Sequence, residues 1–467
     1  MTLGDGLIMI DVLFVNLPIQ WYYQKDTAVF NDFNPSLGLL CLATALEANG
    51  RNAHICDLTH EKIGKTEFIK LIKEKEPKIV AISAYTENID MALHFAAVIK
   101  KEFPKINIAI GGPHASLSQE FFYESTNVDF LLIGEGEATI LELVEALDSE
   151  EKVLKYADIP GLWYWKDGNV HENEKRDFII DLDLYPIPKR EYFSLDNYAK
   201  NANINIYTSR GCPNRCIYCS ASALSGSKYR VRSIDNVFLE MILVTKLIGE
   251  KNFFIVDDSF TVLKNRVYRF IELIKQYNPK FYWNCESIAN VMNEELLKLM
   301  SEARCTAIQY GIESGNKEVQ KKIKKNVNLE HAEEIIYKTA EYGMMPCASF
   351  IIGHYCDTEE TVRDTLNMMK RLKNNTDVEI AAGFNTPFPG TYQYENRDEL
   401  GIRMKVTNYK SFDLLTPIIE TDNFTVDDQR NWLYEVRNIV YAKGNYFKEM
   451  KKEKMKANFN RDEEKAT

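Results

Sequence analysis

Short apolar segments alternate with segments of helical periodicity through the first 150 residues of the chain. The apolar segments are rich in Val and Ile, as buried strands are, and we expect strands over residues 11–17, 53–56, 79–83, 106–110 and 128–133. We expect helices over residues 36–49, 65–75, 89–101, 117–123 and 137–147. Such alternation predicts an α/β domain over residues 1–150, with a flavodoxin-like (Rossmann-type) parallel sheet.

A second alternation begins at residue 204 and has longer helices between its strands. Strands are expected over residues 204–209, 253–257, 281–286, 306–311, 347–352 and 378–384. Helices are expected over residues 234–248, 266–276, 294–301, 330–342 and 359–372. Six such units predict a partial (β/α)6 barrel of the TIM type over residues 204–395.

Neither alternation extends into residues 151–203 or 396–467. The first of these segments is expected to be a connector that contains a hairpin, because apolar residues alternate around the turn pair Asp167-Gly168. The second is expected to be a small helical C-terminal region. Helical spacing of Trp432, Val436 and Ile439 within 426–446 indicates a packing stripe rather than a site.

The composition narrows the class of protein. Apolar residues make up 45% and charged residues 27%, which is typical of a globular protein that stays in water, and a net charge of -11 argues against a nucleic-acid partner. No run of about 18 uncharged apolar residues is present for a membrane span. Nine cysteines, an odd number, indicate a reducing compartment, so we expect a cytoplasmic protein.

Three of the cysteines form a C-x3-C-x2-C motif directly after the first strand of the second alternation. Three thiolates of Cys212, Cys216 and Cys219 can hold three irons of a [4Fe-4S] cluster and leave the fourth iron open. A structural zinc site would need four protein ligands, and no second cysteine pair is present to supply them. The other six cysteines lie singly in apolar runs, as free cysteines usually do.

Polar residues follow several of the expected barrel strands, and barrel chemistry gathers at the carboxyl ends of strands. Asp257 and Asp258 follow the second strand, Glu313 and Ser314 the fourth, and Gly353 the fifth. One of the two aspartates could instead be a helix N-cap.

Small and hydroxyl residues follow the strands of the first domain. They are Ser83, Thr86, Gly111, Gly112 and Gly134, with Glu135 beside the last. Glycines there let a backbone approach a bulky ligand, although any single one could be an ordinary turn glycine. Since no G-x-G-x-x-G follows the first strand, a dinucleotide is a weak interpretation.

Taken together, these motifs resemble those of radical S-adenosylmethionine enzymes that carry a cobalamin-binding domain, the class B radical methyltransferases among them. The resemblance rests on Arg210-Gly-Cys-Pro-Asn-Arg-Cys-Ile-Tyr-Cys-Ser220, Gly111-Gly-Pro-His-Ala-Ser116, Gly134-Glu-Gly-Glu137 and Gly311-Ile-Glu-Ser-Gly315. The usual Pro-Gly-Glu-Thr after the fifth strand is here Tyr355-Cys-Asp-Thr358. His60 is interpreted as a surface histidine, and the resemblance implies that no histidine binds cobalt.

The resemblance implies three cofactors: a [4Fe-4S] cluster, S-adenosylmethionine and cobalamin. Cys212, Cys216 and Cys219 would bind the cluster, Tyr218 and the backbone up to Gly353 would flank adenine, and Asp257, Asp258, Glu313 and Ser314 would hold the methionyl and ribose portions. Ser83, Thr86, Gly111, Gly112, Gly134 and Glu135 would bind cobalamin.

The resemblance also implies the reaction. Reductive cleavage of S-adenosylmethionine would give a 5'-deoxyadenosyl radical, which would activate an unactivated substrate centre for methylation from methylcobalamin. A cyclase or rearrangement enzyme with the same cofactors, a cobalamin-free radical enzyme, and a cobalamin carrier or sensor with a structural cluster remain alternatives. A small-molecule or peptide substrate and an external one-electron reductant such as flavodoxin or ferredoxin are the expected partners.

Overall fold

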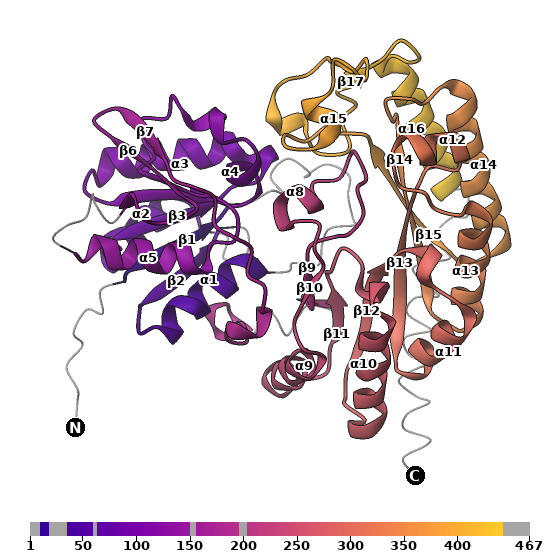
Figure 1. The fold of residues 1–467 in the computed structure, drawn as a ribbon, viewed down its shortest axis with the longest axis horizontal. Coiled ribbons are helices and arrows are strands. Elements are labelled where there is room, and N and C mark those ends of the chain that lie inside the picture. The colour runs from indigo at the N-terminus through magenta and orange to yellow at the C-terminus, as the bar shows by residue number, and fades with distance from the viewer. Residues whose placement is uncertain (1–9, 18–34, 59–62, 150–155, 196–202, 442–467) are drawn as a thin grey trace.

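A mixed sheet and an all-parallel sheet, each with helical layers, lie beside each other in the computed structural model, which describes residues 10–17, 35–58, 63–149, 156–195 and 203–441. The first sheet and its helices form one half of the molecule, and the second sheet with the C-terminal elements forms the other (Figure 1). His60 and residues 442–446 of the expected last helix lie outside the described residues.

The first sheet has the order β2-β1-β3-β4-β5-β6-β7. Its parallel part consists of β1 (Val12–Asn16), β2 (Ala53–Asp57), β3 (Ile79–Ser83), β4 (Asn107–Gly111) and β5 (Phe130–Leu132). This 2-1-3-4-5 order is the flavodoxin-like order that the sequence predicted. The expected hairpin, β6 (Leu162–Lys166) and β7 (Asn169–Glu172), turns at Asp167-Gly168 and adds two antiparallel strands to the edge at β5.

The helices of this half are α1 (Leu37–Ala48), α2 (Lys65–Lys75), α3 (Ile89–Glu102), α4 (Pro113–Leu117) and α5 (Glu137–Leu147). Four of them agree with the predicted helices. The prediction of a helix over 117–123 was wrong, because the chain leaves helical geometry at Ser118, whose φ is -143°. The helix begins earlier, at Pro113, whose fixed φ suits a first helical position, and 119–122 form a separate 3-10 turn.

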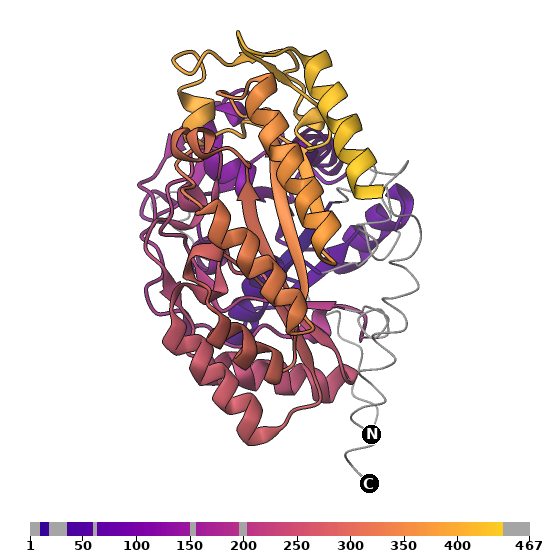
Figure 2. The ribbon, with the colours of Figure 1, turned by 90° about the vertical axis from the view of Figure 1, so that its right-hand side faces the viewer.

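The second sheet is all parallel, with the order β15-β14-β13-β12-β11-β8. Its strands are β8 (Asn203–Ile206), β11 (Asn252–Ile255), β12 (Tyr282–Ser287), β13 (Cys305–Glu313), β14 (Met345–Ile352) and β15 (Glu379–Phe384). The helices are α9 (Ile234–Ile248), α10 (Lys264–Tyr277), α11 (Glu294–Glu302), α13 (Leu329–Glu341) and α14 (Glu359–Asn375). They cover the outer face of the open barrel, away from the first sheet (Figure 2). The predicted partial barrel is confirmed.

Two short helices of the barrel were not predicted: α8 (Ala221–Ser225) and α12 (Lys317–Lys322). The C-terminal part carries α15 (Tyr392–Glu395), a two-stranded ribbon of β16 (Arg403–Met404) and β17 (Ile419–Glu420), and α16 (Val426–Tyr441). Helix α16 lies beside α14 (Figure 2), where Trp432 is buried and its indole N–H donates to Glu359 at 2.7 Å. The stripe around Trp432 is therefore a packing stripe, as predicted.

Among the described residues, no helix combines the length and apolar character that crossing a membrane would require. All nine cysteines lie within the described residues, and none of them forms a disulfide.

Candidate active site

The three-cysteine motif lies on a loop at the carboxyl end of β8, the edge strand of the barrel. The loop starts after β9 (Ser209–Arg210) and returns through α8 to β10 (Arg230–Val231), which pairs antiparallel with β9. Gly211 has a φ of +89°, and a Cβ there would lie 2.4 Å from the carbonyl oxygen of Lys228. Only glycine permits this approach, so Gly211 closes the two ends of the loop tightly onto each other.

The three thiols lie in surroundings that suit cluster ligands. Cys212 is buried, and Cys216 and Cys219 are half-buried. The Asn214 side-chain amide donates to the sulfur of Cys212, and the Ala221 backbone N–H donates to the sulfur of Cys219, each at 3.4 Å. Burial raises the pKa of Cys219 to about 11, so metal binding there displaces a proton.

These thiols do not converge on one point. Within the described residues, no three His, Cys, Asp or Glu side chains come together as ligands of a single metal ion. A [4Fe-4S] cluster makes no such demand, because each thiolate binds a different iron. The donor set, three thiols of one loop with N–H groups directed at sulfur, therefore fits a cluster better than a mononuclear site.

The predicted pair Asp257 and Asp258 divides into a buried and an exposed carboxylate. Asp257 is 2% exposed and accepts hydrogen bonds from the backbone N–H groups of Thr208 and Ser209, at 2.6 and 3.1 Å, and from both their hydroxyls, at 2.5 and 2.6 Å. Burial raises its pKa even though these hydrogen bonds oppose the shift. Asp258 is exposed at the strand exit. Asp257 thus fixes the start of the cysteine loop, and Asp258 is open to a ligand.

Glu313, at the end of β13, forms an ion pair with Lys325, a residue that the sequence analysis missed. The Lys325 ammonium lies 3.1 Å from the Glu313 carboxylate, and both side chains are largely buried. Burial disfavours the charged form of Lys325, but Glu313 and then Cys216 outweigh it and raise its pKa. A Cβ at Gly311 would lie 2.5 Å from the Glu313 carboxylate and 2.7 Å from the ammonium, so Gly311 leaves the space that the pair occupies.

The neighbouring Ser314 is fully buried, and its hydroxyl oxygen lies 3.3 Å from that of Thr365 on α14. The Gln320 amide on α12 donates to the carbonyls of Ile312 and Ser314, each at 2.6 Å. Helix α12 also reaches the cysteine loop, where the Ile217 N–H donates to the Ile323 carbonyl at 3.1 Å. These contacts hold the strand exit, the Lys325 segment and the loop together.

Gly353, predicted after β14, has a φ of +82°, and a Cβ there would lie 2.5 Å from the Gln429 amide. The N–H groups of Gly353 and His354 donate to the buried Asp357 carboxylate at 3.1 and 2.8 Å. Asp357 therefore shapes the loop in which the resemblance expected glutamate. The ring of Tyr218 lies 5.5 Å from that of His354, so the cysteine loop and the β14 exit are neighbours.

A second residue missed by the sequence analysis is Glu286, half-buried near the carboxyl end of β12. Burial raises its pKa to about 7, helped by the charge of Asp258 and opposed by Lys325. It could have been found from its place near the end of a predicted strand. Lys325 carried no such signal, because it ends a run of similar lysines at 321, 322 and 324.

Glu286→Gln is expected to stabilise the cofactor-free protein at alkaline pH. The pKa of Glu286 is about 7 in the folded protein and has its ordinary value of 4.5 in the unfolded chain. Between pH 4.5 and pH 7, the folded protein therefore binds more protons than the unfolded chain. Stability therefore falls as pH rises from 4.5 to 7. The variant lacks this cost, about 3 kcal/mol. Thermal midpoints should differ at pH 8 and converge at pH 4.5, and an equal difference at both would contradict the assignment.

The residues predicted in the first domain gather at the carboxyl edge of its sheet. Ser83 and Gly111 are register partners on β3 and β4. Gly112 has a φ of +97°, and a Cβ there would lie 2.9 Å from the Ala84 carbonyl. The Thr86 hydroxyl lies 3.2 Å from Nδ1 of the buried His114, the pKa of which burial lowers to about 4.

Gly134 and Glu135 follow β5 at the same edge. Gly134 has a φ of +80°, and its N–H donates to the Ser116 hydroxyl at 2.9 Å. The Glu135 carboxylate, however, points to the barrel. It pairs with Arg230 at 2.9 Å and with Arg210 at 3.1 Å, while Glu137 pairs with Arg210 at 2.6 Å. The two arginines stand at either end of the cysteine loop.

The two sheet edges face each other across the cysteine loop. Helix α4, after β4, contacts α8, which follows the third cysteine (Figure 1). A Cβ at Gly390, in the loop after β15, would lie 2.8 Å from the Leu117 side chain. Tyr409, from the C-terminal part, lies 4.9 Å from the His114 ring, centroid to centroid. The candidate residues of both domains thus belong to one region.

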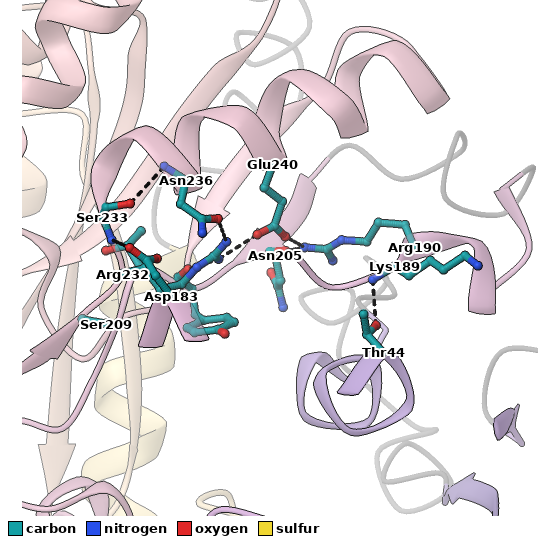
Figure 3. A network of polar contacts seen from close by, with 12 residues as sticks. Thr44, Asp183, Lys189, Arg190, Asn205, Ser209, Arg232, Ser233, Asn236 and Glu240 are labelled. Atoms are coloured by element: carbon teal, nitrogen blue, oxygen red, sulfur yellow. Dashed lines mark hydrogen bonds and ion pairs between the residues drawn. The ribbon is translucent and has the colours of Figure 1, made fainter. Parts of the chain in front are cut away.

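A second polar network joins the same two halves (Figure 3). The buried Glu240 on α9 accepts a hydrogen bond from Arg190 at 2.6 Å and forms an ion pair with Arg232 at 2.7 Å. Next to Arg190, the Lys189 N–H donates to the Thr44 hydroxyl on α1 at 2.9 Å. The connector is therefore tied to both the first domain and the barrel.

Comparison with protein families assigns the two halves separately. Residues 206–369 match the family model of the Radical SAM superfamily, and residues 24–144 match that of the B12 binding domain. The first match contains all three cysteines of the loop, and the second contains the carboxyl ends of β2 to β5 in the first sheet.

Individual proteins resemble the chain over most of its length. A protein of Pyrococcus horikoshii, named an uncharacterized methyltransferase, is 31% identical over 397 residues, 84% of each chain. The anaerobic magnesium-protoporphyrin IX monomethyl ester cyclase of Rubrivivax gelatinosus is 25% identical over 420 residues, 86% of this chain and 72% of that one. The radical S-adenosylmethionine methyltransferase TsrM of Kitasatospora setae, with cobalamin and a [4Fe-4S] cluster bound, has a similar fold. Its TM-score is 0.71 at 19% identity, and the match covers 88% of this chain and 83% of that one.

Proposed function

The chain belongs to the radical S-adenosylmethionine enzymes that carry a B12-binding domain, and we therefore propose that it methylates an unactivated centre of its substrate with cobalamin as the methyl carrier. The observation that carries the proposal is the position of the three-cysteine loop, opposite the carboxyl edge of the first sheet. When bound, the cluster supplies the electron that cleaves S-adenosylmethionine, and cobalamin supplies the methyl group.

Different barrel residues would bind the cluster and S-adenosylmethionine. Cys212, Cys216 and Cys219 would hold the cluster, and the exposed Asp258 would contact S-adenosylmethionine directly. Glu313 would present its carboxylate to the amino group, because the ion pair with Lys325 holds that carboxylate in place. Asp257 and Ser314 would support the S-adenosylmethionine site without contacting the ligand, because their polar atoms are already hydrogen-bonded to other protein groups.

Two backbone segments would complete this half of the site. Tyr218 would flank adenine from the cysteine loop, and Gly353, whose positive φ is supported by Asp357, would flank it from β14. In the first domain, Ser83, Thr86 and the backbone at Gly111, Gly112 and Gly134 would bind cobalamin.

The partners follow from this chemistry. We propose a small-molecule or peptide substrate, enclosed between the two sheet edges and the C-terminal part, and an external one-electron reductant such as flavodoxin or ferredoxin. The nine cysteines, none of which forms a disulfide, support an enzyme that works in the reducing cytoplasm.

The test needs no knowledge of the substrate. Protein reconstituted anaerobically and desalted after incubation with hydroxocobalamin should carry about four irons and one cobalt per chain. Titanium(III) citrate and S-adenosylmethionine with a trideuterated methyl group are then added. We expect 5'-deoxyadenosine to form and the labelled methyl group to appear on cobalamin by mass spectrometry.

Other outcomes point to other functions. Irons without cobalt would leave a cobalamin-free radical enzyme, and cobalt without 5'-deoxyadenosine would leave a carrier or sensor. The similarity to a cyclase makes cyclisation the second candidate function. That function predicts 5'-deoxyadenosine with no label on cobalamin.

A further inference from the structure

Both ends of the cysteine loop are tied by ion pairs to one turn of the first domain. Arg210 stands two residues before Cys212, and Arg230 lies on β10, where the loop returns. Arg210 pairs with Glu135 and Glu137, and Arg230 pairs with Glu135. The two carboxylates belong to the turn Gly134–Glu137, which follows β5 at the edge proposed for cobalamin.

The connector completes this arrangement between the two partners. The Ile179 N–H donates to Glu135 at 2.8 Å, and the Ile179 carbonyl accepts from Arg230 at 2.7 Å. The Phe178 ring lies 4.7 Å from the Arg230 guanidinium, and a Cβ at Gly226 would lie 2.8 Å from that ring. Three segments far apart in sequence thus meet around one buried guanidinium.

The contact is built from buried, directional and balanced charges. The side chain of Arg230 is 2% exposed, that of Glu137 5% and that of Glu135 9%. Two carboxylates face two guanidiniums, so the set is neutral. Buried ion pairs add little stability over apolar packing, but their fixed geometry can select one arrangement of the elements they join.

The polar network of Figure 3 is linked to Arg210 through the ring of Tyr207. Tyr207 lies between two guanidiniums, with Arg210 at 5.2 Å and Arg232 at 4.8 Å from its ring centroid. Arg232 in turn pairs with Glu240, which also holds Arg190 of the connector (Figure 3). The two halves of the molecule are therefore joined at two points along one seam.

We propose that Glu135 and Glu137, with Arg210 and Arg230, form an interdomain clamp that fixes the cobalamin-binding edge relative to the cluster loop. The functional part of this inference rests on the proposed methyl transfer. Under it, the four residues are positioning residues, because they touch no reacting atom and set the distance that the methyl group and the substrate radical must bridge. Glu135, expected from sequence to bind cobalamin, is given a different task by this inference.

The test compares two changes on the same part of the first domain. E135Q/E137Q removes both carboxylates of the clamp and keeps the shape of the side chains. E142Q, on α5, is the matched control, because it removes an ion pair between the first domain and Arg176 of the connector and leaves the cluster loop untouched. Nitroxide labels are placed on the exposed positions Lys101 of α3 and Lys246 of α9 through encoded ketone side chains, which spares the nine cysteines.

Pulsed electron paramagnetic resonance on the cofactor-free protein then gives the interdomain distance distribution. We expect E135Q/E137Q to widen that distribution at least twofold and E142Q to leave it as in the wild type. An unchanged width in E135Q/E137Q would overturn the clamp. Where the double variant does not fold, E137Q alone, which retains the Glu135 to Arg230 pair, should widen the distribution to a smaller extent, and no widening would again overturn the clamp.

The loaded enzyme separates the clamp from the proposed function. E135Q/E137Q should keep wild-type iron and cobalt per chain, form 5'-deoxyadenosine within about twofold of the wild-type rate, and lose at least tenfold in methylated product per 5'-deoxyadenosine once a substrate is known. Loss of cobalt in the variant would show that the carboxylates bind cobalamin and would overturn the clamp. A wild type that does not label cobalamin would reject methyl transfer, while the distance measurement would still decide the clamp.

Discussion

Cys216→Ala is expected to reduce the cleavage of S-adenosylmethionine to less than about one thousandth of the wild-type rate, a loss of about 4 kcal/mol in activation free energy. Cys216 is the middle ligand of the proposed cluster, and residues 210–220 contain no fourth cysteine that could replace it. Reconstituted variant should carry less iron, and 5'-deoxyadenosine formed with titanium(III) citrate is the measurement.

The control for this change is Cys347→Ala. Cys347 is also a half-buried thiol of the barrel, but it lies near the amino end of β14, opposite to the end where the cysteine loop lies. Iron content and 5'-deoxyadenosine formation should stay within about twofold of wild type, because surface and partly buried positions away from a site usually tolerate truncation. Cleavage that persists in Cys216→Ala and not in Cys347→Ala would refute the assignment of the loop.

The regular elements were predictable because local signals agree with the tertiary structure. Helix α9 has both ends where the sequence placed them, since Ser233 caps its start and Gly249 ends it at a φ of +85°. The strands of both sheets were found from their apolar runs, and the order of alternation was enough to predict parallel sheets. The family and its cofactors were implied by the resemblance of the cysteine loop and of the strand-end motifs in both domains to known motifs, and the comparisons confirm them.

Elements that depend on distant contacts were not predictable in this way. Helix α12 is short and rich in lysine, and it is held by Asn316 at its start and by packing of Val319 and Ile323 against Ile217 of the cysteine loop. The ion pairs around the site were missed for the same reason. Glu137 and Arg210 are 73 positions apart, and sequence patterns hold no information on such pairs.

Asp257→Ala should be the most destabilising single change at the barrel edge, by about 4 kcal/mol, because it leaves two buried backbone N–H groups without acceptors at about 1–3 kcal/mol each. Those N–H groups, of Thr208 and Ser209, begin the segment that leads into the cysteine loop. Burial lowers the pKa of the Arg266 guanidinium, and the change removes the Asp257 charge, which opposes that shift. We expect a lower thermal midpoint and less iron per chain after reconstitution.

The neighbouring Asp258→Ala is the matched control, since Asp258 is exposed at the same strand exit. Its stability should stay within about 0.5 kcal/mol of wild type, while its affinity for S-adenosylmethionine should fall. Asp257→Asn should lie between the two, because an amide oxygen can still accept from some of the four donors. If Asp258→Ala were the less stable of the two alanine variants, the division into a buried positioning carboxylate and an open ligand carboxylate would be wrong. The order of stability of these three variants thus tests whether Asp257 serves the fold at this strand exit while Asp258 serves the chemistry.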